Sequence, residues 1–320
     1  AAPREILEAD PRREGTPRPE VLRAFTFRWA GAPDLAGRLE PGRAAQWLRE
    51  AAAEVLARPE FALWRAEALT AVRAEAVVAQ LERLARAIAE WTATNAFRPA
   101  AAEWRFGPRG ALPAWQLGLP AGRAVELSGS VDRADTARAD DGRERLVVYD
   151  YKTRARSPDA VLEAHGVELQ LTLYLAVLED LLRAQGREAA PAGAFYVPLR
   201  PARADADDAA AQRGRFQCDG FAADHARPML DSSDGASGQF KWQPRDGRMK
   251  LSAPDLTARL DAARSLVRGF AGRIFAGDCA VALFRHRDQT ACDWCGWTRC
   301  WSKGRSSSRP TTRTNCKIAK

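Results

Sequence analysis

The sequence predicts an α/β fold with a helical N-terminal region, and three observations carry this prediction. Apolar residues recur at steps of three and four before residue 92, which is typical of an amphipathic helix. Two short apolar runs, residues 125–131 and 146–149, are typical of β-strands. An apolar helix and a buried strand follow, so strands and helices are mixed along the chain. The residues on the amphipathic face are Val77, Leu81, Leu84, Ile88 and Trp91.

The N-terminal elements come first in the chain. Residues 43–57 and 59–73 have a helical pattern, with Pro59 near a helix start. After Pro99, residues 102–106 are expected to form a strand that leads toward Asp132. We therefore expect residues 1–98 to form a helical N-terminal region.

The second half of the chain predicts two more helices and another strand. We expect a helix from about residue 157 or 158 to 185, a buried strand over 194–199 and a helix over 254–275. Between them, residues 203–250 are polar and rich in Gly, Asp and Ser, and they are interpreted as an insertion with a short strand near 240–242.

Two acids and a lysine form the candidate chemistry. Asp132 and Asp150 each follow an apolar run, so each carboxylate is expected at the C-terminal end of a strand. Lys152 lies two residues after Asp150, and on a strand the two side chains share a face. Two carboxylates can hold Mg²⁺ through oxygen ligands, and a lysine side chain beside them can orient or deprotonate a water. The alternative is a surface strand in which Asp-x-Lys occurs by chance.

The order of three segments is more specific than any one of them. Residues 129–135 (GSVDRAD), 150–153 (DYKT) and 170–174 (QLTLY) together resemble the PD-(D/E)xK nuclease superfamily. Within it, they most resemble the RecB-like nuclease domain at the C-terminus of AddB-type helicase–nuclease subunits. The resemblance implies a restriction-endonuclease-like core, with a mixed central sheet flanked by helices. The resemblance covers residues 75–300, and we expect the nuclease domain over residues 99–301.

The resemblance also implies roles for individual residues. Asp132 and Asp150 would bind Mg²⁺ or Mn²⁺ together with the Tyr151 carbonyl, and Lys152 would be catalytic. Gln170 and Tyr174 would lie beside the site, since they are four apart on one helix face. Two arginines, Arg133 and Arg154, are candidate phosphate contacts, although a solvated surface position is the alternative for Arg154.

A further metal ligand could come from either of two places in the chain. Members of the family often carry a glutamate on the strand that contains Glu103, which we interpret here as structural. The family also often has a metal-binding His or Glu on an upstream helix. This chain has no histidine before His165, and no upstream glutamate can be singled out.

A cysteine cluster follows the last predicted helix. Cys292, Cys295 and Cys300 lie within nine residues, a spacing typical of metal ligands. The resemblance implies a [4Fe–4S] cluster, but no cysteine precedes Cys218, and the last spacing differs from that of the family. Cys279, Cys218 or Cys316 could supply a fourth ligand, or none. A zinc site and reduced thiols without a metal are the alternatives.

Composition sets limits on the class of protein. The chain has 320 residues and a net charge of +8, but residues 302–320 hold six basic residues and no acids, which leaves +2 for the rest. This basic tail is expected to be disordered. No apolar run is long enough to span a membrane, no signal peptide is visible, and the cysteine usage fits the cytoplasm. The absence of an initial methionine suggests a fragment.

The sequence thus predicts a Mg²⁺-dependent DNA nuclease domain, expected to be an exonuclease, of a helicase–nuclease that acts in double-strand-break repair and recombination. Its expected partners are single- or double-stranded DNA ends and a helicase subunit, and not a membrane. Two alternatives stay open. The domain could be a catalytically silent DNA-binding or assembly module of such a complex, or a free-standing nuclease of the CRISPR-adaptation type.

Overall fold

The structure is a computed structural model of the whole chain. It describes residues 17–32, 34, 37–201, 216–242, 247–278, 280, 285–286 and 289–290. The described residues up to Ala276 form one compact unit, and those from Gly277 onward form a second. The second unit contains a two-stranded sheet of β8 (Arg285–His286) and β9 (Gln289–Thr290).

A mixed five-stranded sheet lies at the centre of the first unit, as predicted. Its strand order is β1-β4-β5-β6-β7. The strands β5 and β6 are parallel, and the other neighbours are antiparallel. A parallel pair needs a crossover connection, and here the crossover contains a helix. The strands are β1 (Arg98–Phe106), β4 (Gly129–Arg138), β5 (Glu144–Lys152), β6 (Ala189–Pro198) and β7 (Asp219–Ala222).

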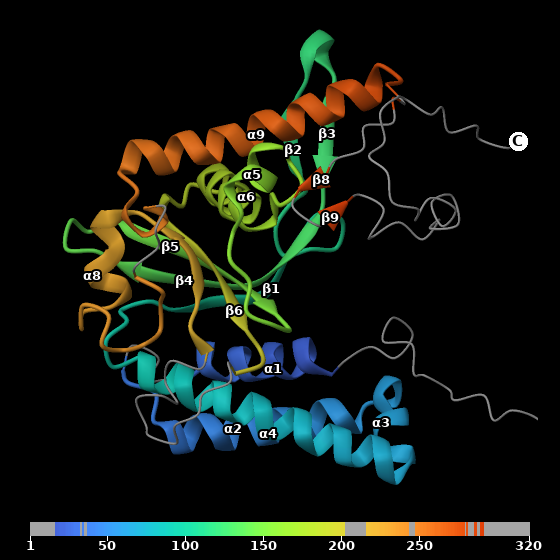
Figure 1. Ribbon diagram of the computed structural model, residues 1–320, viewed down its shortest axis with the longest axis vertical. Helices are drawn as coiled ribbons and strands as arrows, with labels where there is room; N and C mark the ends of the chain where they lie inside the picture. Colours follow the sequence, from blue (N-terminus) through green and yellow to red (C-terminus); the bar gives the residue numbers. More distant parts are fainter. Residues whose placement is uncertain are drawn as a thin grey trace, which may run out of the picture. The chain divides into compact units, whose positions relative to one another are not determined.

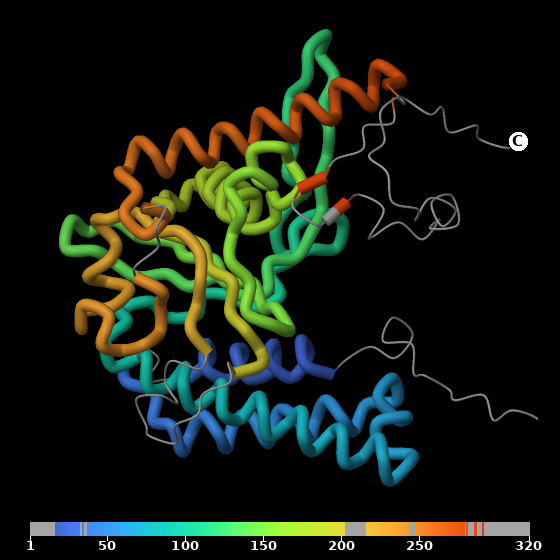
Figure 2. The backbone as a smooth tube through the Cα atoms, in the orientation of Figure 1, coloured from blue at the N-terminus to red at the C-terminus, as the bar shows by residue number. Residues whose placement is uncertain are grey.

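The helices cover the two faces of this sheet (Figure 1). On one face lie α6 (Gln170–Ala184) and, packed on it, α9 (Ala253–Phe275). On the other lies α1 (Arg18–Ala30), which contacts β1 and is packed on α2 (Pro41–Ala57). The N-terminal helices form a layer of their own beneath the sheet, as the backbone in Figure 2 shows. One hydrophobic core runs through both layers.

The N-terminal region is helical, as predicted, but one of its predicted helices is interrupted. The expected helix over 59–73 is replaced by η1 (Pro59–Phe61), α3 (Leu63–Ala66) and the start of α4 (Ala68–Trp91). The backbone is extended at Glu67, where a capping box with Thr70 begins α4. Because this box satisfies free N–H groups at the helix start, the chain begins a new helix there.

The predicted strand over 125–131 is two strands. The first, β3 (Ala124–Leu127), forms a hairpin with β2 (Trp115–Gly118), and the second is β4. The chain changes partner at Ser128, because Gly129 already pairs with Phe106 of β1. Asp132 therefore lies inside β4, and the expectation that it ends a strand was wrong.

The helix predicted over 157–185 is also divided. It consists of α5 (Ala160–Ala164) and α6, with Gly166 between them at a φ of +75°. A Cβ at Gly166 would lie 2.3 Å from Phe270 Cζ on α9, at the tip of a side chain that can move, so it is the backbone conformation that favours glycine. The division places Gln170 at the start of α6.

Part of the predicted insertion belongs to the central sheet. The edge strand β7 is fully buried and pairs with β6, so the interpretation of 203–250 as a polar insertion is corrected for residues 219–222. No helix within the described residues is both long and apolar enough to cross a membrane. The remaining short elements are η2 (Pro120–Gly122), η4 (Asp224–Ala226), α8 (Arg227–Leu230) and η5 (Arg248–Lys250).

Candidate active site

Two aspartates lie side by side on the central strands. The ladder between β4 and β5 pairs Arg133 with Tyr149. One step further along these antiparallel strands, Asp132 faces Asp150. The Tyr151 N–H donates a 2.8 Å hydrogen bond to Asp132 Oδ2, which holds this carboxylate against β5. The sequence prediction that these two acids meet agrees with their places in the structure.

A third acid continues the row onto β1. The ladder between β1 and β4 pairs Ala102 with Arg133 and Trp104 with Val131, so the residue between them, Glu103, faces Asp132. Carboxylates on three adjacent strands thus occupy neighbouring positions. Glu103 was interpreted as structural from the sequence, and the structure instead places it with the two aspartates in one cleft.

The backbone at Glu103 is unusual for a strand. Its φ is +46°, in the left-handed region that non-glycine residues seldom adopt. The Ser130 hydroxyl donates a 2.8 Å hydrogen bond to Glu103 Oε2. Strain of this kind persists only where surrounding structure imposes it, and it is concentrated at functional sites. The sequence signal for this position was the glutamate that the family often carries on this strand, whereas the strain comes from the tertiary structure and leaves no pattern in the sequence.

Lys152 lies among the same groups. Its Nζ is 2.5 Å from Asp150 Oδ2 and 2.9 Å from Gln170 Oε1, which accepts a hydrogen bond from the ammonium. The Gln170 side-chain amide donates in turn to the Tyr174 hydroxyl at 3.2 Å. The structure therefore joins Asp150, Lys152, Gln170 and Tyr174 into one chain of contacts, as the sequence predicted for residues near a common site.

The ammonium also contacts an aromatic ring that was not predicted from the sequence. Tyr196 is paired with Asp150 in the ladder between β5 and β6, and Lys152 Nζ lies 5.4 Å from the centre of its ring. Burial raises the pKa of Tyr196 to about 12, so the phenol stays protonated. The Lys152 carbonyl accepts a 2.7 Å hydrogen bond from the Leu199 N–H, which fixes the end of β5.

The cleft around these groups has a wall from the N-terminal helical layer. It encloses about 280 Å³ and is lined by the carboxylates, Lys152, Gln170 and residues at the start of α1. These are Pro19, Leu22 and Arg23. No upstream metal ligand was predicted from the sequence, and the helix beside the carboxylates presents an arginine to the cleft.

The electrostatics of the cleft favour a positive ligand. Burial raises the pKa of Asp132 to about 7; the Asp150 carboxylate adds to this rise, and the Tyr151 N–H opposes it. Burial likewise raises the pKa of Asp150, while the hydrogen bond and charge of Lys152 lower it. Two adjacent carboxylates with poor access to water are costly when both are ionised, and a bound cation would offset that cost.

The donor set fits a hard divalent cation. Within the described ranges, no three His, Cys, Asp or Glu side chains converge to form a complete metal site. Mg²⁺ commonly takes only one or two carboxylates and completes its coordination with waters and phosphate oxygens. Asp132, Asp150 and the Tyr151 carbonyl are therefore sufficient protein ligands for such an ion, with Glu103 beside them.

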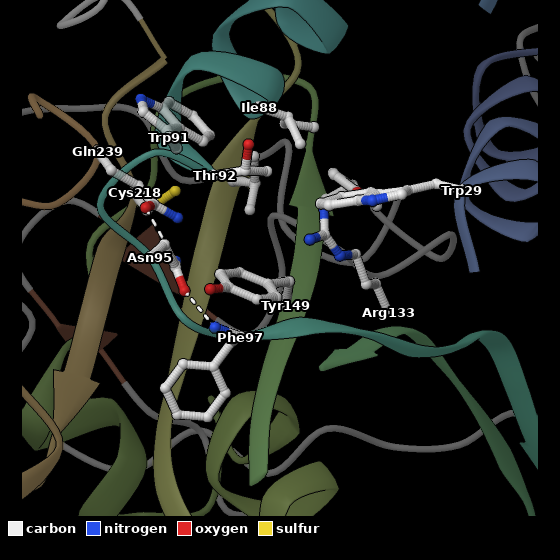
Figure 3. A pocket seen from close by; sticks show the side chains of 12 residues that line it. Trp29, Ile88, Trp91, Thr92, Asn95, Phe97, Arg133, Tyr149, Cys218 and Gln239 are labelled. Carbon is white, nitrogen blue, oxygen red and sulfur yellow. Dashed lines mark hydrogen bonds between the residues drawn. The ribbon is translucent and has the colours of Figure 1, made fainter. Parts of the chain in front are cut away.

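The two candidate phosphate contacts lie outside this cleft. Arg133 is only 7% exposed and forms a bidentate ion pair with Asp135, at 2.7 Å and 2.5 Å. Its guanidinium lies between the rings of Trp29 and Tyr149, as Figure 3 shows. Its position is that of a buried structural residue and does not support phosphate binding. Arg154 is exposed on the segment after β5 and does not line the cleft.

The predicted cysteine site lies outside the described residues. Cys292, Cys295 and Cys300 are among the residues that the structure does not describe, as are Cys279, Cys316 and the basic tail. Cys218 is fully buried in the core, where burial raises the pKa of its thiol. Metal-bound cysteines are thiolates, so this environment does not favour Cys218 as a ligand. The cysteine-bound centre remains a prediction.

Comparison with known proteins agrees with the geometry. Residues 17–300 match the model of the PD-(D/E)XK nuclease superfamily. The chain is also similar to an ATP-dependent helicase/deoxyribonuclease subunit of Moorella thermoacetica, with 34% identity over 67% of this chain. The corresponding protein of Desulforudis audaxviator is 32% identical over 68% of the chain. In both cases the match spans about a fifth of the relative's length.

Proposed function

The chain belongs to the PD-(D/E)XK nuclease superfamily, and we propose that it is a divalent-metal-dependent deoxyribonuclease domain. We propose further that it acts as an exonuclease within a larger helicase–nuclease. One observation carries the catalytic part of this proposal. Asp132, Asp150 and Lys152 line a single cleft, and the ammonium contacts both a carboxylate and the amide of Gln170.

The carboxylates and the Tyr151 carbonyl would hold Mg²⁺ or Mn²⁺. When bound, such an ion lowers the pKa of a coordinated water and stabilises charge on phosphoryl oxygens. Ionised Asp132 and Asp150 are needed for this, although burial favours their protonated forms. The site would therefore exchange protons for the cation when it is loaded.

Lys152 would position the attacking water or a phosphoryl oxygen. An ammonium has three N–H donors. Gln170 accepts from one of them, and Asp150 Oδ2 lies 2.5 Å from the ammonium as its ion-pair partner, so a donor is left for a group in the cleft. A fixed donor aimed at developing negative charge stabilises the transition state more than the ground state. Tyr174 would act through Gln170, whose amide donates to its hydroxyl.

The test is cleavage of end-labelled linear DNA, single- and double-stranded, with Mg²⁺ or with EDTA. We expect Mg²⁺-dependent products from the parent protein and none from Asp150→Ala. Asp140→Ala is the matched control, because Asp140 is an exposed aspartate in the turn between β4 and β5. Retained cleavage in Asp150→Ala would overturn the assignment. No cleavage by folded, DNA-binding parent protein would favour a catalytically silent module.

The mode of cleavage needs a second substrate. An exonuclease degrades a linear strand from its end and leaves a covalently closed circle of the same sequence intact. We expect short products from the linear strand and none from the circle. Cleavage of the circle at a comparable rate would show an endonuclease and overturn the exonuclease proposal.

The proposed helicase partner comes from the relatives, which are named as subunits of an ATP-dependent helicase/deoxyribonuclease. Co-expression with the genes beside this one, followed by affinity purification, tests it. We expect a subunit with ATPase activity to co-purify. A chain that cleaves DNA but captures no ATPase would contradict the assembly proposal while leaving the nuclease intact.

A further inference from the structure

The wall that α1 contributes to the cleft carries an arginine and an aromatic ring. Arg23 lines the cleft with the carboxylates and Lys152. Phe27 lies four residues further along α1, so it is on the same side of the helix. The Arg23 guanidinium lies 5.5 Å from the centre of the Phe27 ring. The two side chains therefore form a continuous surface that begins inside the cleft and leaves it along α1.

Both side chains are accessible to a ligand. Phe27 is 50% exposed, and the Arg23 side chain is 38% exposed. Glu20 accepts a hydrogen bond from Arg23 at 3.2 Å, and it also pairs with Arg58 at 3.0 Å. A guanidinium has five N–H donors, so this contact leaves Arg23 able to bind an anion. Ion pairs between partly exposed side chains are weak, and a phosphate can compete for the arginine.

The chemistry of this pair matches one nucleotide of a single strand. A guanidinium binds phosphate oxygens, and an exposed aromatic ring offers a face on which an unpaired base can stack. The bases of a duplex are already stacked on one another, so they do not offer that face. Isolated exposed apolar residues are common on protein surfaces. Phe27 differs because the arginine stacked on it also lines the cleft.

We propose that Arg23 and Phe27 form a binding site for one nucleotide of a single-stranded nucleic acid at the entrance to the cleft. Arg23 holds a backbone phosphate beside the one to be cleaved, and Phe27 stacks on the adjoining base. The proposal rests on the proposed nuclease function for the identity of its ligand. It assigns to α1 a role in guiding one strand toward Lys152.

The test measures binding without cleavage. The probe is a fluorescein-labelled oligothymidylate, and the readout is fluorescence anisotropy in EDTA. A second probe has the same number of phosphates but abasic sugars. We expect Phe27→Ala to weaken binding of the oligothymidylate about tenfold and to leave binding of the abasic strand unchanged. Phe27→Tyr should restore affinity for the oligothymidylate, because a phenol ring still stacks.

Arg23→Ala should have a different signature. Loss of a phosphate contact weakens binding of both probes, and it reduces the slope of log affinity against log salt by about 0.7. Phe27→Ala should not change that slope. The pair Arg123 and Phe275 gives matched controls, because Arg123 also lies 5.5 Å from a ring that is 49% exposed, and neither residue lines the cleft. Their alanine variants should bind both probes like the parent.

Three results would overturn the proposal. Equal weakening of both probes by Phe27→Ala would show that the ring only supports Arg23. Unchanged affinity in both Phe27→Ala and Arg23→Ala would show that α1 does not bind the strand. A parent protein that binds duplex DNA but not the oligothymidylate would show the same. Because these measurements need no metal or turnover, absent cleavage would not affect them. Thermal denaturation of each variant confirms that it is folded.

Discussion

The Tyr151 N–H donates a 2.8 Å hydrogen bond to Asp132 Oδ2, and this bond links the two strands that carry the carboxylates. Tyr151 lies between Asp150 and Lys152 in the chain. One backbone hydrogen bond therefore sets the position of the β4 acid relative to both functional residues of β5. The site is organised by strand register, and a shift of one residue would turn every one of these side chains to the other face.

Lys152→Ala should abolish most cleavage without loss of DNA binding. The ammonium donates to Gln170 and forms an ion pair with Asp150, and it still has an N–H to donate to a reacting group. Removal of such a group should lower kcat by about 10²- to 10⁴-fold. Single-turnover cleavage measures this effect. Lys250→Ala is the control, because Lys250 is exposed and does not line the cleft. A variant that cleaves like the parent would refute the role.

Gln170→Ala should lower kcat about tenfold, because the Lys152 ammonium loses the acceptor that orients it. Tyr174→Phe should have a smaller effect, since the tyrosine hydroxyl contacts only the amide of Gln170 in this relay. The two changes act on one chain of contacts, so the double variant should resemble Gln170→Ala. Rates that multiply in the double variant would show that Tyr174 acts independently. The measurement is kcat and KM for each variant, and KM should change little.

The stability of the metal-free protein should fall as pH rises toward neutrality. The folded-state pKa of Asp132 is raised from 3.8 to about 7, mainly by burial. The folded state thus binds a proton that the unfolded state releases, and the stabilisation present below about pH 4 is lost as pH rises through about 7. The full effect has an upper limit of about 4 kcal/mol, because one pKa unit corresponds to about 1.4 kcal/mol.

Asp132→Asn removes this titration. In EDTA, the variant should gain stability relative to the parent between about pH 4 and about pH 8. Urea unfolding at several pH values measures the difference in the free energy of unfolding. Asp140→Asn, at the exposed turn, should follow the parent at every pH. Parallel curves for Asp132→Asn and the parent would show that Asp132 titrates normally.

Arg133→Ala should destabilise the fold and leave DNA contacts unaffected. The change would leave the Asp135 side chain, which is 1% exposed, without its ion-pair partner. Breaking a buried pair in this way costs about 3–5 kcal/mol. Urea unfolding measures the cost, and Arg138→Ala is the control on an exposed position of the same strand. A stable variant with a reduced salt slope for DNA binding would instead restore the phosphate-binding prediction.

Site residues that lie close together in the sequence could be predicted to lie close together in space. Asp150 and Lys152 share a face because strand side chains alternate, and Gln170 and Tyr174 because they are four apart on a helix. The meeting of Asp132 with Asp150 follows from their strands being neighbours. The mixed sheet was expected through the family resemblance, which these same residues carried.

Elements that depend on distant partners were missed. Residues 25–29 of α1 alternate between apolar and other side chains, a pattern with a period of two that hides a helix. The strand β7 has only four residues, and one is Gly220, where a Cβ would lie 2.0 Å from the Ala194 carbonyl oxygen. Glycine weakens the strand signal while close packing requires it. In both cases tertiary contacts decide the structure.

The position of Glu103 in the cleft was also not predicted from the sequence, and its backbone conformation can be tested by mutation. Its φ of +46° is costly for any residue with a Cβ and ordinary for glycine. Glu103→Gly should therefore raise the free energy of unfolding by about 1 kcal/mol, measured with urea in EDTA. The same change removes a carboxylate beside Asp132, so the Mg²⁺ concentration needed for half-maximal cleavage should rise.

Glu103→Gln separates the two effects of that change. It retains the strained backbone and removes the charge, so the Mg²⁺ concentration needed for half-maximal cleavage should rise without a gain in stability. Ser130→Ala removes the hydroxyl that donates to Glu103 Oε2 and should have a smaller effect on the metal requirement. A glycine variant that is more stable and equally active would show that the strain at Glu103 serves no catalytic purpose. A less stable one would show that the side-chain contacts outweigh the backbone strain.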